Sequence, residues 1–206
     1  MVVCLLSMLI ARPCHAQSVS LMKGWSISFN PLGALEPQAA LGIGVGYRFS
    51  SRWQLWSETS LIAYPLYNSY PGLKGFREIL ALKYFYGRNR DFFIGAEVRW
   101  KRTSYRDKRL FINRAVHDTA DLNYTLVNPV FGAALWAGKI IPLGGKHWLV
   151  ETSIGVGFKY QSAIFKGVPP GYRNFYKLDD TGIPVGIKGS GLLPYLPGSI
   201  RLIYVL

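Results

Sequence analysis

The side chains best suited to acid–base or metal chemistry lie together in one polar segment. His117 is preceded by Arg114 and followed by Asp118 and Asp121. A histidine beside carboxylates can hold a metal ion or move a proton if the fold brings their polar atoms within bonding distance. These residues define one alternative, an enzyme acting on lipid or peptide that uses His117 with Asp118 or Asp121. The simpler interpretation is that they are solvated loop residues.

The rest of the sequence offers no other catalytic motif. It contains no HExxH, no GxSxG and no cysteine cluster. Residues 144–146 have the composition of a turn and lack the spacing of a phosphate-binding loop. His147 directly precedes Trp148, which favours an anchoring role at a membrane interface. We therefore expect no enzyme, no cofactor and no metal.

The elements that must position these residues are strands, because eight segments alternate between apolar and other residues with a period of two. Residues 148–160 show the pattern clearly, with Ile154, Val156 and Phe158 on one face and Gly155 and Gly157 on the other. The predicted strands are residues 25–31, 42–49, 52–64, 77–86, 92–102, 129–141, 148–160 and 199–206. Residues 129–141 are apolar on both faces, so their register stays open.

The connections between the predicted strands alternate in length. Residues 50–52, 87–91 and 142–147 form short turns, whereas residues 65–76, 104–123 and 161–197 form long loops. The first loop, residues 34–38, is the one brief exception. Bacterial outer-membrane barrels have this asymmetry, with short turns in the periplasm and long loops outside the cell. The sequence therefore predicts an all-β fold, an eight-stranded antiparallel up-and-down transmembrane β-barrel with short periplasmic turns and long extracellular loops.

The apolar faces of the strands are expected to point outward, toward lipid. Glycines on the opposite faces suit a narrow lumen, and aromatic residues at strand ends suit the two membrane interfaces. The expected interface residues are Phe49, Trp53, Tyr86, Phe92 and Trp148 on the turn side and Tyr64, Tyr105, Tyr124 and Tyr160 on the loop side. A soluble lipocalin-like binding barrel, with its apolar face inward, is the alternative.

Charged residues that share the glycine-rich faces would lie inside the barrel. They are Arg48, Glu58, Lys83, Glu97, Arg99, Lys101, Glu151, Lys159 and Arg201. Because unpaired charges are costly in a dry interior, these side chains should pair and hydrogen-bond with one another. An eight-stranded barrel is only wide enough for its own side chains, which favours a structural plug over the alternative of a gated ion path.

Residues 1–16 have the pattern of a signal peptide, which would leave residues 17–206 as the mature barrel. A short apolar run precedes Cys14 and Ala16, small residues in the arrangement of a cleavage site. Both cysteines, Cys4 and Cys14, fall in this segment. We accordingly expect export and localisation in the outer membrane of a Gram-negative bacterium.

The basic residues indicate an anionic partner. The formal net charge is +13, but lysines and arginines are scattered through strands and loops, and export argues against nucleic acid. The expected partners are outer-membrane lipid and lipopolysaccharide phosphates, with a surface glycan or protein as a further possibility. The loop residues proposed for such contacts are Arg109, Arg114, His117, Arg173 and Tyr176. The barrel is expected to be a monomer.

Several short motifs resemble those of one family of bacterial barrels. They are NPLGA at residues 30–34, SRW at residues 51–53, KYFYG at residues 83–87, and the paired segments 137–145 and 154–160. The sequence is similar to a bacteroidete-type family of eight-stranded outer-membrane β-barrels classed as a domain of unknown function. The resemblance covers nearly all of residues 17–206. It implies a fold and a location, but no activity and no catalytic residues.

Overall fold

The structure is a computed structural model that describes residues 23–31, 38–65, 72–113, 115–143, 147–174 and 191–206. In this described part, no helix is long and apolar enough to span a membrane. The strands are β1 (Gly24–Asn30), β2 (Gln38–Arg48), β3 (Trp53–Pro65), β4 (Lys74–Tyr86), β5 (Phe92–Asn113), β6 (Asp118–Pro142), β7 (Trp148–Gln161), β8 (Ile164–Lys166), β9 (Tyr172–Asn174), β10 (Gly191–Tyr195) and β11 (Gly198–Val205).

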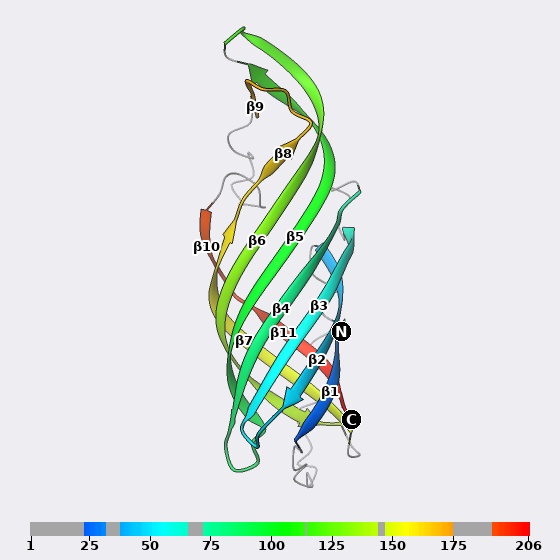
Figure 1. Ribbon diagram of the computed structural model, residues 1–206, viewed down its shortest axis with the longest axis vertical. Coiled ribbons are helices and arrows are strands. Elements are labelled where there is room, and N and C mark those ends of the chain that lie inside the picture. The colour runs from blue at the N-terminus through cyan, green and yellow to red at the C-terminus, as the bar shows by residue number, and fades with distance from the viewer. Residues whose placement is uncertain (1–22, 32–37, 66–71, 114, 144–146, 175–190) are drawn as a thin grey trace, which may run out of the picture.

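Eight of the strands close into an antiparallel barrel (Figure 1). Each of β1 to β6 pairs with the next strand along the chain, and β11 lies between β7 and β1. At the closing seam, Ser26 is opposite Val205, and the amide of Leu206 donates to the carbonyl oxygen of Trp25 at 3.0 Å. The predicted eight-stranded, up-and-down, all-antiparallel barrel is confirmed.

The prediction of a loop at residues 104–123 is wrong, because β5 and β6 continue through it as a hairpin. These strands have 22 and 25 residues and stay paired up to Asn113 and Asp118. Figure 1 shows the hairpin rising far beyond the other barrel strands. The two-residue alternation persists there, since Tyr105 and Phe111 are buried while Arg106 and Lys108 are exposed. Burial of the alternate apolar side chains stabilises these residues as strands.

The predicted loop at residues 161–197 also contains strands. β8 pairs with β6 in the register of β7, so it continues β7 after a break at Ser162 and Ala163. In the same way, β10 pairs with β7 in the register of β11, and the two are separated by Leu196 and Pro197. Proline has no N–H to donate to the ladder, which accounts for the second break.

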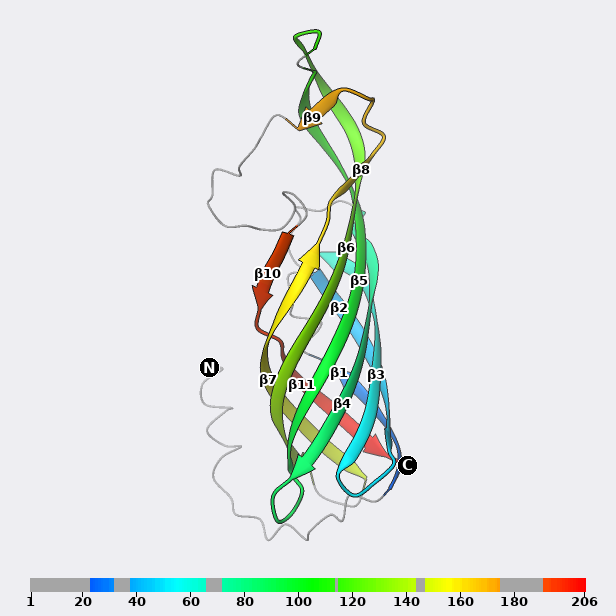
Figure 2. The same cartoon turned by 60° about the vertical axis from the view of Figure 1, so that its left-hand side comes forward.

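Beyond the barrel rim, β9, β5, β6 and β8 form a four-stranded extension (Figure 2). We call this sheet the arm. Its apolar face and the barrel mouth share one buried cluster, which consists of Ala40, Ile62, Leu73, Tyr105, Phe111, Tyr124 and Leu126. The cluster ties the arm to the barrel.

The arm corrects two of the predicted interface aromatics. Tyr105 and Tyr124 are each 4% exposed, and the ring of Phe111 lies 5.3 Å from that of Tyr124. They lie inside the apolar face of the arm and not at a membrane interface, because β5 and β6 extend past the rim. Tyr160 is exposed, as predicted. The side chain of Tyr64 lies outside the described part of the structure.

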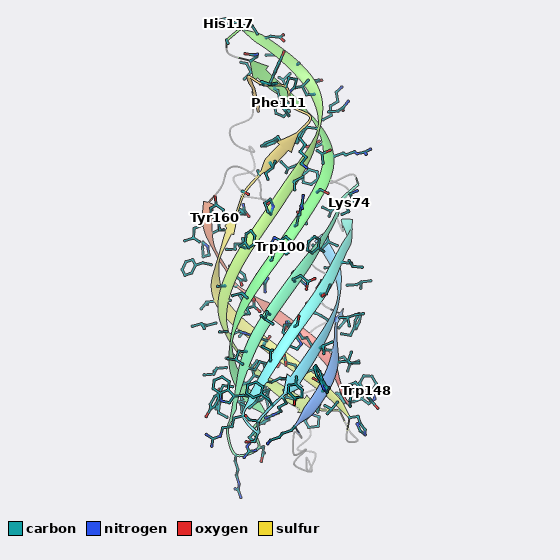
Figure 3. All side chains as sticks on the ribbon, in the orientation of Figure 1. Lys74, Trp100, Phe111, His117, Trp148 and Tyr160 are labelled. Carbon is teal, nitrogen blue, oxygen red and sulfur yellow. The ribbon has the colours of Figure 1, made fainter. Side chains whose placement is uncertain are left out.

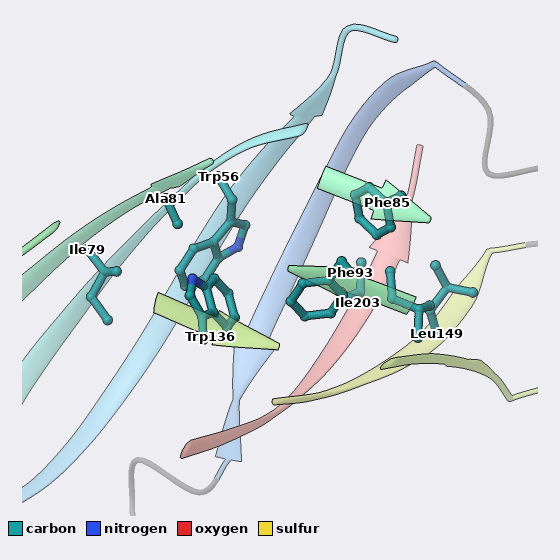
Figure 4. Close-up of a cluster of buried hydrophobic side chains, with 9 residues drawn as sticks. Trp56, Ile79, Ala81, Phe85, Phe93, Trp136, Leu149 and Ile203 are labelled. Carbon is teal, nitrogen blue, oxygen red and sulfur yellow. The ribbon is translucent and has the colours of Figure 1, made fainter. Parts of the chain in front are cut away.

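The interior of the barrel is packed with aromatic and aliphatic side chains (Figure 4). The cluster comprises Trp56, Ile79, Ala81, Phe85, Phe93, Trp136, Ile140, Leu149 and Ile203. The open register of residues 129–141 is thereby decided, with Trp136 inward and Leu135 outward. Gly138 lies against the ring of Phe93, where a Cβ atom would overlap that ring. Glycine on the inner faces therefore makes room for large rings in a narrow lumen.

Candidate functional site

A buried layer of charges crosses the middle of the lumen. Glu151 on β7 accepts from Lys83 Nζ on β4 at 2.5 Å and from Arg201 Nη1 on β11 at 2.8 Å. Arg201 Nε also donates to Glu58 on β3 at 3.0 Å. All four residues are at most 4% exposed. We call Glu58, Arg77, Lys83, Glu151 and Arg201 the charge layer.

Strand register explains how these residues meet. Arg201 and Glu151 are directly opposite each other on β11 and β7. Glu58 reaches Arg201 across the lumen, although the two are 143 residues apart in the sequence. All of them project inward because each occupies the inner parity of its strand, where side chains of alternate residues point to one face.

Arg77 joins the layer, although the sequence analysis did not include it in the network. Its Nη2 atom lies 3.4 Å from Glu58 Oε1 and donates to Ser60 Oγ at 3.3 Å. The sequence pattern could have identified Arg77, because it precedes Lys83 by an even number of positions on β4 and so points to the same, inward face. With Arg77 included, the layer holds three cations and two carboxylates, and so carries one formal positive charge in excess.

Aromatic rings surround the cations of the layer. Lys83 Nζ lies 4.8 Å from the ring centroid of Trp56, 5.2 Å from that of Phe93 and 5.1 Å from that of Trp136. Arg201 Cζ lies 4.0 Å from the Trp56 ring. Ring faces attract desolvated cations, by about 2 kcal/mol for a well-placed pair. The rings thus partly replace the water that the cations lose and help to hold the excess positive charge.

The other predicted lumen residues lie outside this layer. Glu97 and Arg99 pair at 2.5 Å on the mouth side, where Tyr195 donates to Glu97 at 3.1 Å. Arg48 lies at the turn end, donates to the carbonyl oxygen of Ser51 at 2.7 Å and stacks on the ring of Phe85. Lys101 and Lys159 are half-buried. Of the nine predicted residues, Glu58, Lys83, Glu151 and Arg201 thus belong to the charge layer, and Glu97 and Arg99 pair nearer the mouth.

The His117 segment does not assemble into a catalytic site among the described residues. His117 is exposed at the tip of the arm with a φ of 49°. Asp118 accepts a hydrogen bond from the hydroxyl of Tyr172, which raises the pKa of Tyr172 above its ordinary value. Asp121 lies 3.7 Å from Lys108 Nζ. Both carboxylates are thus engaged by other side chains, and no three His, Cys, Asp or Glu residues of the described part group as metal ligands.

The remaining predicted loop residues are only partly described. Arg109 lies on β5 and Arg173 on β9, but their side chains are outside the described part of the structure. Arg114 and Tyr176 lie outside the described residues altogether, as do residues 1–16. His147 stacks on Tyr204 with ring centroids 5.4 Å apart, and its Nδ1 atom is 2.7 Å from the carbonyl oxygen of Val205.

No family model matches this chain, and no curated protein matches it. Among solved structures, the crystal structure of the N-terminal β-barrel domain of Pseudomonas aeruginosa OprF is similar, with a TM-score of 0.36 and 9% sequence identity. The match covers 89% of this chain and 98% of that domain.

Proposed function

We propose that this chain is an integral outer-membrane β-barrel with a structural or surface-interaction role, and that it is not an enzyme. The observation that supports the proposal is the outer surface of the barrel, where a belt of exposed apolar side chains lies between two rows of aromatic rings. The apolar belt matches the acyl-chain region of a bilayer, and the two aromatic rows match its two interfaces with water.

The belt is apolar on every strand of the barrel. Its most exposed members include Ile43, Leu135, Ile154 and Val156, each at least 63% exposed. Between the aromatic rows, Glu78 is the only charged residue among the outward-facing described residues, and it accepts a hydrogen bond from Thr59 at 2.8 Å near the loop-side row. Exposing such a surface to water costs about 25 cal/mol of free energy for each Å² of apolar area. Contact with lipid acyl chains avoids this cost.

The row at the turn end consists of ring pairs on neighbouring strands. We call it the turn-side girdle, made of Trp25 with Tyr47, Trp53 with Tyr84, Tyr86 with Phe92, and Trp148 with Tyr204, whose centroids are 4.7, 4.9, 6.1 and 5.0 Å apart. Figure 3 shows Trp148 at this end of the barrel. Such rings suit a membrane–water interface because one edge is apolar and the other carries a polar group.

The second row lies nearer the mouth. The loop-side girdle is made of Phe76, Trp100, Phe131 and Tyr160, and Trp100 lies 4.9 Å from Phe76 and 6.1 Å from Phe131. Phe92 and Trp100 are eight residues apart on β5. At about 3.3 Å per residue and a tilt near 40°, that separation is about 20 Å of height, close to the apolar band of outer-membrane barrels.

A soluble binding barrel would need the opposite arrangement. Its lumen would be apolar and open, but here Lys83, Glu58 and Glu151 are buried inside, at most 1% exposed. A pore is disfavoured for the same reason, because the charge layer and the rings of Trp56 and Trp136 occupy the lumen. Among the described residues, the enzyme alternative has no supporting geometry, since Asp118 and Asp121 contact Tyr172 and Lys108.

A matched pair of arginine substitutions tests the proposal. Leu135 faces outward midway between the girdles, and Thr59 faces outward at the level of Trp100, beside Glu78. In phosphatidylcholine vesicles, Leu135→Arg should lower the free energy of unfolding by about 2–4 kcal/mol, and Thr59→Arg by about 0–1 kcal/mol. Urea titration followed by tryptophan fluorescence measures both.

Gel migration provides the independent check. The folded wild-type chain in detergent should migrate differently before and after boiling, and it should remain with vesicles after carbonate washing. Equal costs for the two arginine variants, or a wild-type chain that stays dispersed in water without detergent, would refute the proposal.

A further inference from the structure

The outward face of the arm carries cations directly above the loop-side girdle. Arg102 and Arg106 on β5 and Lys166 on β8 are exposed, and strand register places Arg106, Thr125 and Lys166 side by side. Figure 2 shows β5, β6 and β8 adjacent at this height. Within the described residues, none of these three cations has an acidic partner, whereas the nearby Lys108 pairs with Asp121. We call Arg102, Arg106 and Lys166 the cationic patch.

The surface at the patch is hollowed. A cavity of about 710 Å³ is lined by Arg106, Asp107, Lys108, Asn123, Thr125 and Lys166, among others. The carboxylate of Asp107 accepts a hydrogen bond from the hydroxyl of Tyr124 at 3.0 Å. Its walls thus provide several cationic and amide donors and a hydroxyl group, the groups that bind phosphate oxygens and sugar hydroxyls. The hollow is large enough for a headgroup and not only for a single ion.

A second, apolar hollow lies on the turn side of the first and also includes residues of β5 and β6. This groove of about 1130 Å³ is lined by Ala96, Val98, Ala133, Leu135 and Phe158, among others. Alanines form its floor, and larger apolar side chains form its walls, so it provides room for acyl chains within the lipid-facing belt. Ala133 is directly opposite Val98 in the register of β5 and β6.

The girdle separates the two hollows. Along β5 the order is Val98 in the groove, Trp100 in the girdle and Arg106 in the patch. Trp100 stacks on Phe131 with an interplanar angle of 17°. Val98 and Arg106 are eight residues apart, which corresponds to about 26 Å along the strand. This sequence of apolar groove, aromatic boundary and cationic hollow matches a lipid with long acyl chains and a phosphorylated sugar headgroup.

We propose that this face of β5, β6 and β8 is a specific binding site for a phosphorylated glycolipid of the lipid A class. The phosphates lie among Arg102, Arg106 and Lys166, and the acyl chains lie in the groove over Ala96 and Ala133. The inference rests on the proposed function, since only a barrel in a bilayer presents both hollows to one lipid. A partner protein would not explain why the cationic hollow lies in line with a lipid-facing groove.

Lipid retention by the folded full-length chain in detergent micelles tests the site. The probes are bisphosphorylated hexaacyl lipid A, the same lipid without phosphates, and inorganic pyrophosphate, each measured by native mass spectrometry and thermophoresis. The wild-type chain should bind bisphosphorylated lipid A at least about tenfold more tightly than the dephosphorylated lipid. The triple variant Arg102→Gln, Arg106→Gln, Lys166→Gln should lose this preference.

A charge-matched control separates the site from general attraction. Lys23, Arg52 and Lys139 are exposed cations on the turn side, and their triple glutamine variant removes the same charge. This control should keep lipid A affinity within about twofold of wild type. Ala133→Phe, which fills the groove floor, should weaken binding of hexaacyl lipid A but not of its water-soluble bisphosphorylated disaccharide.

Three outcomes would overturn the inference. They are equal loss of binding in the two triple variants, unchanged lipid A binding in the patch variant, and displacement of lipid A by pyrophosphate at equimolar concentration, which would indicate a free-phosphate site. Gel migration and vesicle insertion of the wild-type chain are measured in parallel. Failure to insert refutes the proposed function, whereas insertion without a preference for phosphorylated lipid A refutes only the glycolipid site.

Discussion

Lys83 and Arg106 carry the same charge in opposite surroundings, and the barrel uses them differently. Lys83 is fully buried, pairs with Glu151 and lies among three aromatic rings. Arg106 is exposed on the arm, with no acidic partner in the described residues. In the charge layer every cation pairs with a carboxylate from another strand. In the cationic patch the cations remain available to a ligand.

The contrast follows from the dielectric surroundings. Inside the lumen, each charge has lost its water, so the loss of one partner leaves an uncompensated buried charge. On the arm, water solvates the cations, and a missing partner costs little. The charge layer should therefore govern stability, whereas the patch should govern recognition. Each prediction below tests one side of this comparison.

The largest effect is expected from Glu151→Gln. This change leaves Lys83 and Arg201 buried without their shared carboxylate, and the layer keeps only Glu58 as an anion. The free energy of unfolding in vesicles should fall by about 3–5 kcal/mol, as measured by urea titration. Glu78→Gln, at the exposed outer surface, is the control and should change it by less than about 0.5 kcal/mol. Similar costs for both would contradict the comparison.

Removing both members of the closest pair should cost less than removing one. The double variant Lys83→Met, Glu151→Leu takes away a cation together with its carboxylate, and Arg201 keeps Glu58 at 3.0 Å. Replacing a buried pair by apolar residues is often neutral or stabilising. We expect the double variant to unfold at a higher urea concentration than Glu151→Gln. A lower midpoint would mean that the Lys83–Glu151 pair itself stabilises the fold, and that the unpaired cation left by Glu151→Gln is not the main cost.

Packing inside the barrel should respond to added volume. A methyl group at Gly138 would overlap the ring of Phe93 and the carbonyl oxygen of Thr152, so Gly138→Ala should destabilise the barrel by about 1–3 kcal/mol. Gly191 has open space around its ideal Cβ, which makes Gly191→Ala the matched control. Thermal gel-shift midpoints would rank the two, and a tolerated Gly138→Ala would show that the lumen can expand.

Neutralising the cationic patch should leave the fold unchanged. The variant Arg102→Gln, Arg106→Gln, Lys166→Gln removes three solvated charges that have no acidic partner in the described residues. Each change should alter the free energy of unfolding by less than about 0.5 kcal/mol. Urea titration measures the free energy of unfolding of this variant and of Glu151→Gln under the same conditions. A loss as large as that of Glu151→Gln would remove the distinction between the two groups of cations.

The smallest effect concerns pH at the arm. The hydrogen bond to Asp118 raises the pKa of Tyr172, so the protonated phenol is favoured in the folded arm. This contribution is present at neutral pH and is lost as the pH rises through the raised pKa. NMR of labelled tyrosine should assign Tyr172 a higher pKa than in Asp118→Asn. An unchanged titration in Asp118→Asn would show that the bond has no influence.

Much of the barrel follows from the sequence. The apolar faces of residues 42–49 and 92–102, for example, are visible because side-chain alternation is a local property of a strand. The parity of Lys83 and Glu151 places them inward for the same reason. The aromatic residues Trp53 and Trp148 lie at the turn end, as expected. Local pattern was therefore sufficient for the eight barrel strands and for most of their faces, but not for the extension of β5 and β6 or the register of residues 129–141.

Other features needed the closed barrel. Tyr105 and Tyr124 are of the residue type expected at a membrane–water interface. Their actual environment depends on how far β5 and β6 extend past the barrel rim. The partners of Glu58 could not be derived either, because Arg77 and Arg201 reach it only through register and closure. His117 and its neighbouring aspartates were close in sequence, yet the arm directs the carboxylates to Tyr172 and Lys108.

The sequence alone determined the apolar face of most barrel strands and the number of strands in the barrel, since side-chain alternation is a property of neighbouring residues. Only the tertiary structure decided which charges neutralise one another and which remain free for a ligand. Those outcomes depend on which strands lie opposite across a closed lumen, and on whether a side chain lies inside it or on the solvated arm.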